Sequence, residues 1–561
     1  MNTAWTHARV EIVAGALEAA TAEMCASLVR SAYSPNVKER ADCSTALCDL
    51  RGRTLSIATH APAHLGSAIR IVPAILERFP VEELAPGDAF FANDPYIVGV
   101  THLNDCTAAA PIFIGQEPVG FAIAVAHHSD VGGRVPGSEA GDSTSIFQEG
   151  IRLPPVRLVE RGKRRDDVWE LFLLNSRTPH YSSGDLQAQL AALERGRVRL
   201  AALYERYGLA GTRTAIEQVL DATEQRLRAR VCEVLRRGTF STVDWLDDDG
   251  VSASPVRLGA SVTIDDGEVI FDFSDCPPQL GSGKNVPLTH TLATAVYCLK
   301  AVVDPALPCN AGIFRVIRIA APEGSVVNPR APAAVSSRNL TSIVLADVLF
   351  GALGQAAHDR ALAPSGAFQG TILAGWDAVR DRYFVDYENF AGGQGALPDR
   401  DGSDAMHVSM TNTSNLPIEA MEMEFPLRIE RYELVPDSGG AGRYRGGLGV
   451  CRDIRVVGDG IVLATRSARQ RFAAQGLDGG ACGRLGSIVV DPDTPAEKRL
   501  PGTGSEISLR QGALLRVVTS GGGGQGAPSK RDAASVADDV RGGKVSQTAA
   551  AEIYECRPSL T

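Results

Sequence analysis

The chain has 561 residues, 44% of them hydrophobic and 22% charged, and a formal net charge of −10. This length predicts two to four domains, and the composition is ordinary for a water-soluble globular protein. The acidic balance argues against a nucleic-acid partner, and because no stretch of about 18 residues is continuously apolar, we expect no membrane span. The start, MNTAWTHARVEIVAG, lacks a basic patch followed by an apolar run, so we expect no signal peptide.

The cysteines indicate a reducing compartment. There are eleven of them, scattered without any C-x-x-C pair. An odd count argues against a disulfide framework, and the missing paired spacing argues against a zinc ribbon. We therefore expect free thiols and a cytoplasmic location.

The first half of the chain is predicted to be mixed helix and strand. Apolar residues at helical spacing predict an amphipathic helix over 10–31. From about residue 35 to 160, short strand-like runs alternate with Gly, Pro, Asn and Asp turns. Within this region VGFAIAVA (119–126) has the short, continuously apolar pattern of a buried strand. Residues 186–237, rich in Ala, Leu, Glu and Arg and broken by two glycines, predict a helical hairpin.

The second half changes character toward its end. Alternating strands are predicted near 261–273, and helices at 290–303 and 341–358. Beyond Pro364 glycine becomes dense, which is typical of β structure with tight turns and close backbone contacts. A helical tail is predicted over 529–551, and no repeat of 20 to 50 residues is present in the sequence.

These elements predict an α+β fold of several parts. We expect an N-terminal metal-bearing α/β region, a helical insertion, an α/β middle region, and a Gly-rich β region that ends in a helix. The predicted boundaries are 1–185, 186–240, 241–364 and 365–561.

A concentration of histidines and acids marks the candidate site. Five of the ten histidines lie between His60 and His128. Imidazole and carboxylate groups together bind divalent transition metals, and both can transfer protons near neutral pH. The acids interleaved with these histidines are Asp42, Asp94, Asp105, Asp130 and Glu149.

His102 and Asp105 are the first candidate ligands. Their spacing of three would place them on opposite faces of a strand, so a shared site requires a turn between them. His127 or His128, at the end of the predicted buried strand, would complete a set of two histidines and a carboxylate. Adjacent strand residues point in opposite directions, so only one of the two can join the set. The alternative is a group of hydrogen-bonded histidines in polar turns.

His60 and His64 have the spacing of a helical metal pair, but Pro62 between them favours a turn. We favour a packing or substrate role for them over metal binding. The surroundings of Asp42, KERADCS, by themselves favour a salt-bridge or turn residue.

The phosphate-binding motifs are incomplete. LGSGKN (280–285) resembles the end of a P-loop, but the earlier glycine is replaced by Pro278. Gly521, Gly523 and Gly526 match G-x-G-x-x-G, yet too little chain follows for a nucleotide-binding unit. There is no G-x-S-x-G motif either. We expect these glycines to form turns, and no ATP site in this chain.

Taken together, the motifs resemble the hydantoinase B/oxoprolinase family, the B-type subunits of ATP-dependent N-methylhydantoinases, lactamases and oxoprolinases. The resemblance covers almost the whole chain. Its segments are KERADCSTALCDLRGR (38–53), HAPAHLGS (60–67), PGDAFFANDPY (86–96), THLNDCT (101–107), AHHSDVGG (126–133), IFQEGIRLPPV (146–156), DFSDCPPQ (272–279), MTNTSNLPIEAMEMEFPLRIERYEL (410–434), PDSGGAGRYRGGLG (436–449) and TSGGGGQG (519–526).

The resemblance implies a divalent metal ion (zinc, manganese or iron). The ligands it implies are His102, Asp105 and His127, with Asp42 as a further carboxylate. It makes three more residues candidates for orienting the ligands or transferring protons. These are His128, Asp130 and Glu149.

The resemblance also implies a partner and a reaction. An A-type subunit would bind ATP and phosphorylate a cyclic amide (a hydantoin, lactam or 5-oxoproline-like ring), and this chain would open the ring within a hetero-oligomer. The alternative within the family is an α-type subunit of an acetone- or acetophenone-type carboxylase. A second alternative is a catalytically silent scaffold. Departures from the family's form leave specificity open; they are Cys43, Cys48, Asn104, Ser336 and Ser337.

Overall fold

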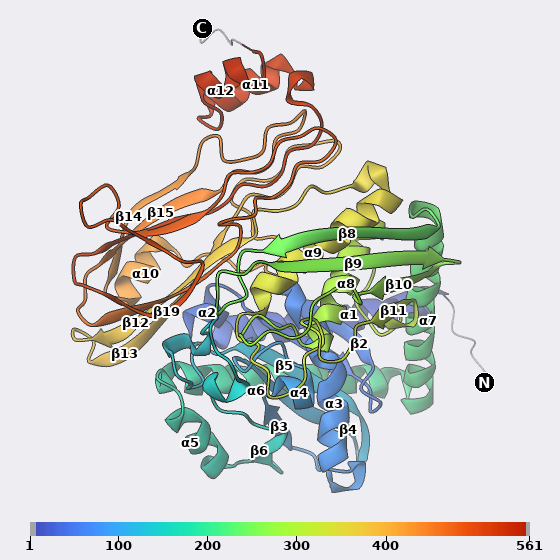
Figure 1. Ribbon diagram of the computed structural model, residues 1–561. Coiled ribbons are helices and arrows are strands. Elements are labelled where there is room, and N and C mark those ends of the chain that lie inside the picture. The colour runs from blue at the N-terminus through green and yellow to red at the C-terminus, as the bar shows by residue number, and fades with distance from the viewer. Residues whose placement is uncertain (1–6, 557–561) are drawn as a thin grey trace.

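The computed structural model describes residues 7–556, with the backbone alone at His7 and Thr59. Four β-sheets and the helices packed on them form an α+β fold, as predicted (Figure 1). The N-terminal sheet lies below the middle region, and the C-terminal β region stands to one side of both. The expectation of no signal peptide depends in part on residues 1–6, which lie outside the described residues.

The N-terminal sheet is antiparallel throughout, in the order β2-β1-β5-β4-β3-β6-β7. Its strands are β1 (Cys43–Cys48), β2 (Thr54–Thr59), β3 (Ala89–Ala92), β4 (Asp105–Ile114), β5 (Glu117–His127), β6 (Val156–Glu160) and β7 (Lys163–Arg164). The predicted buried strand is confirmed as part of β5. It is apolar at every position because both faces of the sheet are covered: Ala122 and Ala124 pack into one core, and Phe121 and Ile123 into another.

Helices cover the two faces of this sheet. On one face lie α1 (His7–Ser31), α6 (Pro179–Tyr207) and the start of α7 (Leu209–Val234). On the other lies α3 (Ser67–Arg78). The shorter helices of this half are α2 (Pro35–Lys38), α4 (Pro95–Val98) and α5 (Asp166–Leu174). The predicted first helix is confirmed, and the predicted helical segment consists of α6 and α7, joined at Gly208.

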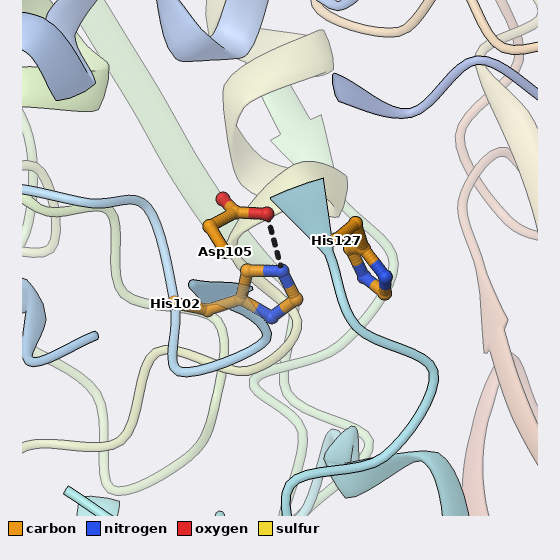
Figure 2. Close-up of side chains that lie close together, drawn as sticks. All are labelled: His102, Asp105 and His127. Atoms are coloured by element: carbon orange, nitrogen blue, oxygen red, sulfur yellow. Dashed lines mark ion pairs between the residues drawn. The ribbon is translucent and has the colours of Figure 1, made fainter. Parts of the chain in front are cut away.

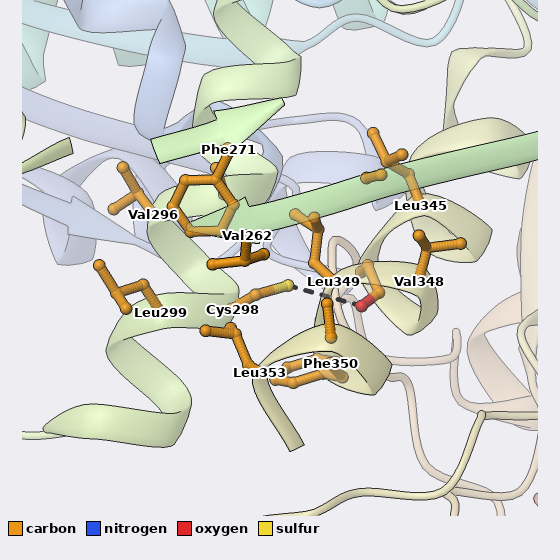
Figure 3. Close-up of a cluster of buried hydrophobic side chains, with 14 of the residues drawn as sticks. Val262, Phe271, Val296, Cys298, Leu299, Leu345, Val348, Leu349, Phe350 and Leu353 are labelled. Carbon is orange, nitrogen blue, oxygen red and sulfur yellow. Dashed lines mark hydrogen bonds between the residues drawn. The ribbon is translucent and has the colours of Figure 1, made fainter. Parts of the chain in front are cut away.

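The middle region has a sheet of order β11-β10-β9-β8 that packs on two helices. Its elements are β8 (Gly238–Leu246), β9 (Val256–Asp265), β10 (Glu268–Asp272), β11 (Ile317–Ala320), α8 (Leu288–Val303) and α9 (Arg338–Ala356). Figure 3 shows Val262 and Phe271 of the sheet in one cluster with Val296 of α8 and Leu349 of α9. Both predicted helices are confirmed. The divisions proposed at 185, 240 and 364 stay predictions.

Two helices in residues 7–556 are long and apolar enough to cross a membrane by length and composition alone, namely 8–31 and α9. In α9, 89% of the apolar window is buried inside the protein, and α1 packs against α6 and the N-terminal sheet. A core helix has the same composition as a membrane span, so this is weak evidence for a membrane.

The C-terminal region contains two antiparallel sheets, in the orders β13-β12-β16-β19 and β14-β15-β20-β17-β18. The strands are β12 (Phe368–Asp377), β13 (Arg382–Ala391), β14 (Leu427–Leu434), β15 (Val450–Val456), β16 (Ile461–Ser467), β17 (Ser487–Val490), β18 (Lys498–Leu500), β19 (Thr503–Leu509) and β20 (Leu514–Val518). The helices are α10 (Ile418–Glu424), α11 (Ala533–Arg541) and α12 (Gln547–Glu552). The last two confirm the predicted helical tail and stand at the top of Figure 1.

Glycine-rich segments connect these sheets to the tail helices by packing backbone against backbone. The amide N–H of Gly522 donates to the carbonyl of Gly447 at 3.0 Å, and the N–H of Gly440 donates to the carbonyl of Gly522 at 2.8 Å. A Cβ atom on Gly393 would lie 1.8 Å from the carbonyl oxygen of Gly447. The run that matches G-x-G-x-x-G therefore serves close backbone packing.

We expect Gly393→Ala to lower the thermal melting temperature by ~5 °C or more, because the added methyl group overlaps a backbone carbonyl that cannot move aside cheaply. Gly281→Ala is the matched control, since nothing lies within 4 Å of a Cβ at that exposed position. Differential scanning calorimetry of both variants checks this. Equal melting temperatures would contradict the packing role.

Candidate metal centre

His102, Asp105 and His127 converge at one end of the N-terminal sheet (Figure 2). Asp105 begins β4 and His127 ends β5, and the two are direct partners in the antiparallel register. Opposed residues of an antiparallel pair project on the same face of the sheet. His102 lies in the turn before β4, as the spacing required, and its Nε2 is 3.2 Å from Asp105 Oδ1. One ligand atom from each residue lies within 4.8 Å of the others.

The chemistry of these three groups fits a divalent cation. Each side chain is at most 1% exposed. His102 Nε2, Asp105 Oδ1 and His127 Nε2 are buried atoms without a hydrogen-bond partner of good geometry. An unpaired buried polar atom is costly, whereas a shared metal ion would satisfy all three. Two imidazoles and a carboxylate are a ligand set for zinc, manganese or iron.

Asp42 and His64 lie beside the triad. His64 Nε2 is 3.4 Å from Asp105 Oδ1 and 3.9 Å from Asp42 Oδ1. The Asp42 side chain is 14% exposed, against 0% for Asp105, so Asp42 lies on the solvent side of the group. Burial alone would raise the pKa of Asp105, but the imidazoles of His102 and His64 hold it well below its ordinary value.

The short 3₁₀ helix η1 (Pro62–Gly66) explains why the two histidines of HAPAHLG differ. Pro62 starts this helix, which confirms a turn in place of an α-helix and turns His64 inward. There the Nδ1 of His64 contacts Ser44 Oγ at 3.0 Å. His60 precedes the helix and is exposed. Spacing alone could not separate them.

His128 lies on the opposite face of the sheet from His127. Its Nε2 contacts Gln189 Oε1 at 3.1 Å, and its ring packs edge-on against Phe91 and Phe172. Burial lowers its pKa. The expected alternation is confirmed: one histidine of the pair joins the triad, and the other packs into the core.

Asp130 and Glu149 organise loops around the triad. Asp130 accepts hydrogen bonds from the N–H groups of Gly132 and Gly137. Glu149 Oε1 accepts the N–H groups of Val335 and Ser336, both at 2.8 Å, immediately before α9. In the described residues neither carboxylate contacts a triad side chain directly.

The sequence does not indicate a buried group beside the triad that consists of Glu139, Arg338, Tyr387 and Arg466. Glu139 Oε1 lies 3.0 Å from His102 Nδ1 and accepts from Arg338 at 3.0 Å. Its Oε2 accepts from the Tyr387 hydroxyl at 2.9 Å and from Arg466. Glu139 lies in a loop, Arg338 in α9, Tyr387 in β13 and Arg466 in β16. No motif or spacing in the sequence connects them.

Comparison with known proteins shows which family the chain resembles along its length. The sequence model of the hydantoinase B/oxoprolinase family matches residues 6–528. Caprolactamase subunit beta of Pseudomonas jessenii is 31% identical over 552 residues, which cover 95% of this chain and 93% of that subunit. 5-Oxoprolinase 1 of Arabidopsis thaliana is 31% identical over 530 residues, 90% of this chain but 40% of that protein.

Solved structures show the same fold. The crystal structure of the ATP-dependent caprolactamase from Pseudomonas jessenii superposes with a TM-score of 0.90 at 29% identity, covering 100% of this chain and 97% of the other. Nucleotide-free acetone carboxylase gives a TM-score of 0.88 at 20% identity, covering 97% and 79%. At that identity the second likeness concerns the fold alone.

Glu149 predicts a pH dependence of stability. Burial raises its pKa to about 8, although two backbone N–H groups oppose the shift. The pKa of Glu149 in the folded protein therefore lies above its value of about 4.3 in the unfolded chain. The protonated carboxyl contributes its full stability below the unfolded-state pKa, and this contribution is lost as pH rises through about 8.

Glu149→Gln keeps an acceptor for both N–H groups and removes the ionisation. Its melting temperature should therefore fall less between pH 5 and 9 than that of the wild type, by roughly a few degrees. Glu506→Gln, at an exposed carboxylate, is the control. Parallel melting curves for wild type and Glu149→Gln would refute the assignment.

Proposed function

Because this chain belongs to the hydantoinase B/oxoprolinase family, we propose that it is the metal-bearing B-type subunit of an ATP-dependent hydrolase that opens small cyclic amides. The observation that carries the proposal is the buried triad, in which His102 Nε2, Asp105 Oδ1 and His127 Nε2 lack hydrogen-bond partners. The names caprolactamase and 5-oxoprolinase support a ring amide as the substrate class.

In this proposal His102, Asp105 and His127 hold the ion, and Asp42 is a further carboxylate at the open side. A divalent ion in such a site supplies Lewis acidity and makes hydroxide available near neutral pH. His64 lies close enough to Asp105 and Asp42 to orient either carboxylate. Asp130 and Glu149 keep the surrounding loops in place, and His128 supports β5 from its other face.

The proposal assigns ATP to an A-type partner in a hetero-oligomer. An amide carbonyl is a poor electrophile, and phosphorylation of its oxygen by the partner would make ring opening easier. The relative's name, subunit beta, and the ATP dependence of caprolactamase support this division. All eleven cysteines are free thiols, which supports a cytoplasmic location.

The second candidate is a subunit of an acetone- or acetophenone-type carboxylase. The fold shared with acetone carboxylase is the specific observation in its favour. A carboxylase requires bicarbonate and a ketone, whereas a hydrolase requires neither. A silent scaffold would need no metal and would tolerate alanine at all three ligands.

We expect the complex that co-purifies with this chain to turn over ATP with one member of a panel of hydantoins, lactams and 5-oxoproline, without bicarbonate. The measurement is ATP hydrolysis over that panel and over ketones, with and without bicarbonate. Turnover confined to a ketone plus bicarbonate would overturn the hydrolase proposal in favour of the carboxylase.

We expect His102→Ala and Asp105→Ala each to lose bound metal and to lower ring opening by ~100-fold or more, because each removes a ligand from a set of three or four. The complex should still assemble. His358→Ala, at a side chain that is 73% exposed, is the control. Bound metal and product formation are measured on the same samples. Full activity in both triad variants would refute the assignment of His102 and Asp105 as metal ligands.

A further inference from the structure

We propose that Glu139 is a positioning residue of the metal centre, which orients His102 and is itself held by Arg338, Arg466 and Tyr387 from later parts of the chain. This inference rests on the proposed metal site and adds to it a carboxylate that sequence spacing did not indicate. It also makes the metal affinity depend on residues outside the N-terminal region.

The first step is the geometry at His102. Its two ring nitrogens face two different carboxylates: Nδ1 is 3.0 Å from Glu139 Oε1, and Nε2 is 3.2 Å from Asp105 Oδ1. A proton on Nδ1 shared with Glu139 leaves the Nε2 lone pair free toward the triad, the arrangement that usually orients a metal-binding histidine. The two atoms are within hydrogen-bond distance, although the angle at Nδ1 is poor.

The side chain of Glu139 is itself held by several polar contacts. The side chain is fully buried, and each of its oxygens has its own cationic partner: Arg338 at Oε1 and Arg466 at Oε2. Tyr387 also donates to Oε2. These contacts reach both oxygens of the carboxylate and hold it in one orientation.

Further hydrogen bonds fix the two arginines that hold Glu139. Arg338 also donates to Thr101 Oγ1 and to the Ser336 carbonyl, at 2.8 and 3.0 Å. Arg466 also donates to the Tyr387 hydroxyl and to Asn389 Oδ1, at 2.8 and 3.1 Å. These contacts occupy both Nη atoms of Arg466 and the Nε and Nη1 atoms of Arg338. These contacts hold both guanidinium groups in place beside Glu139.

Hydrogen bonds hold the backbone on both sides of Glu139. Asp130 accepts the N–H of Gly137 at 2.9 Å, and the Ser336 hydroxyl donates to the Ala140 carbonyl at 2.8 Å. Glu149 in turn holds the N–H of Ser336. Asp130 and Glu149, which do not reach the triad, thereby act on it through Glu139.

The test is Co²⁺ binding to the complex that contains this chain, in wild type and in Glu139→Gln. Co²⁺ affinity is measured by competition with a chelator, and the visible absorption at saturating Co²⁺ reports the ligand geometry. Glu139→Gln keeps the size of the side chain and loses its charge. We expect affinity to fall by about 10- to 100-fold, with a changed spectrum. Tyr387→Phe, which removes one contact to Oε2, should cause a smaller loss in the same direction.

Glu424→Gln is the matched control, because Glu424 is likewise bound by an arginine and a tyrosine, Arg382 and Tyr181. Its Co²⁺ affinity and spectrum should equal those of the wild type. Wild-type affinity and spectrum in Glu139→Gln would overturn the positioning role while leaving the metal site intact. Loss as complete as in His102→Ala would overturn it too, by making Glu139 a ligand. A wild-type complex that binds no Co²⁺ would refute the proposed metal site as well.

Discussion

The pairing of Asp105 with His127 across β4 and β5 is the constraint on which the candidate site depends. Both strands are buried on both faces, so their register is fixed by two separate cores rather than one. A slip of one residue would turn His127 toward Phe172 and bring His128 to the triad face. The site therefore depends on the same packing that stabilises the N-terminal sheet.

Buried charge is the second constraint. Asp105 and Glu139 lie in the interior, where an unpaired carboxylate would be strongly destabilising. Their compensation comes from imidazoles nearby and from guanidinium groups on α9 and β16. The middle and C-terminal regions thus complete a site whose proposed ligands all belong to the N-terminal region.

The G-x-G-x-x-G match at 521–526 serves close backbone packing rather than phosphate binding. Gly521, Gly522 and Gly523 lie so close to neighbouring backbones that any side chain would overlap a carbonyl group. Positions of this kind require glycine for space, whereas a phosphate loop requires it to bring N–H groups to a ligand.

Hydrophobic periodicity reports which faces of an element are buried, so the sequence alone predicts the first helix, β5, α8, α9 and the tail helices. Its motifs also identify the family, and the spacing of His102 and Asp105 requires a turn between them if they share a site. The family resemblance points to His127, but spacing alone leaves His127 and His128 open, and the strand register gives the physical reason for the choice. For His60 and His64 the turn at Pro62 sets which side chain points inward, and spacing does not show it. Glu139, Arg338 and Arg466 lie far apart in the chain, so their convergence follows from packing between regions, which local sequence does not encode.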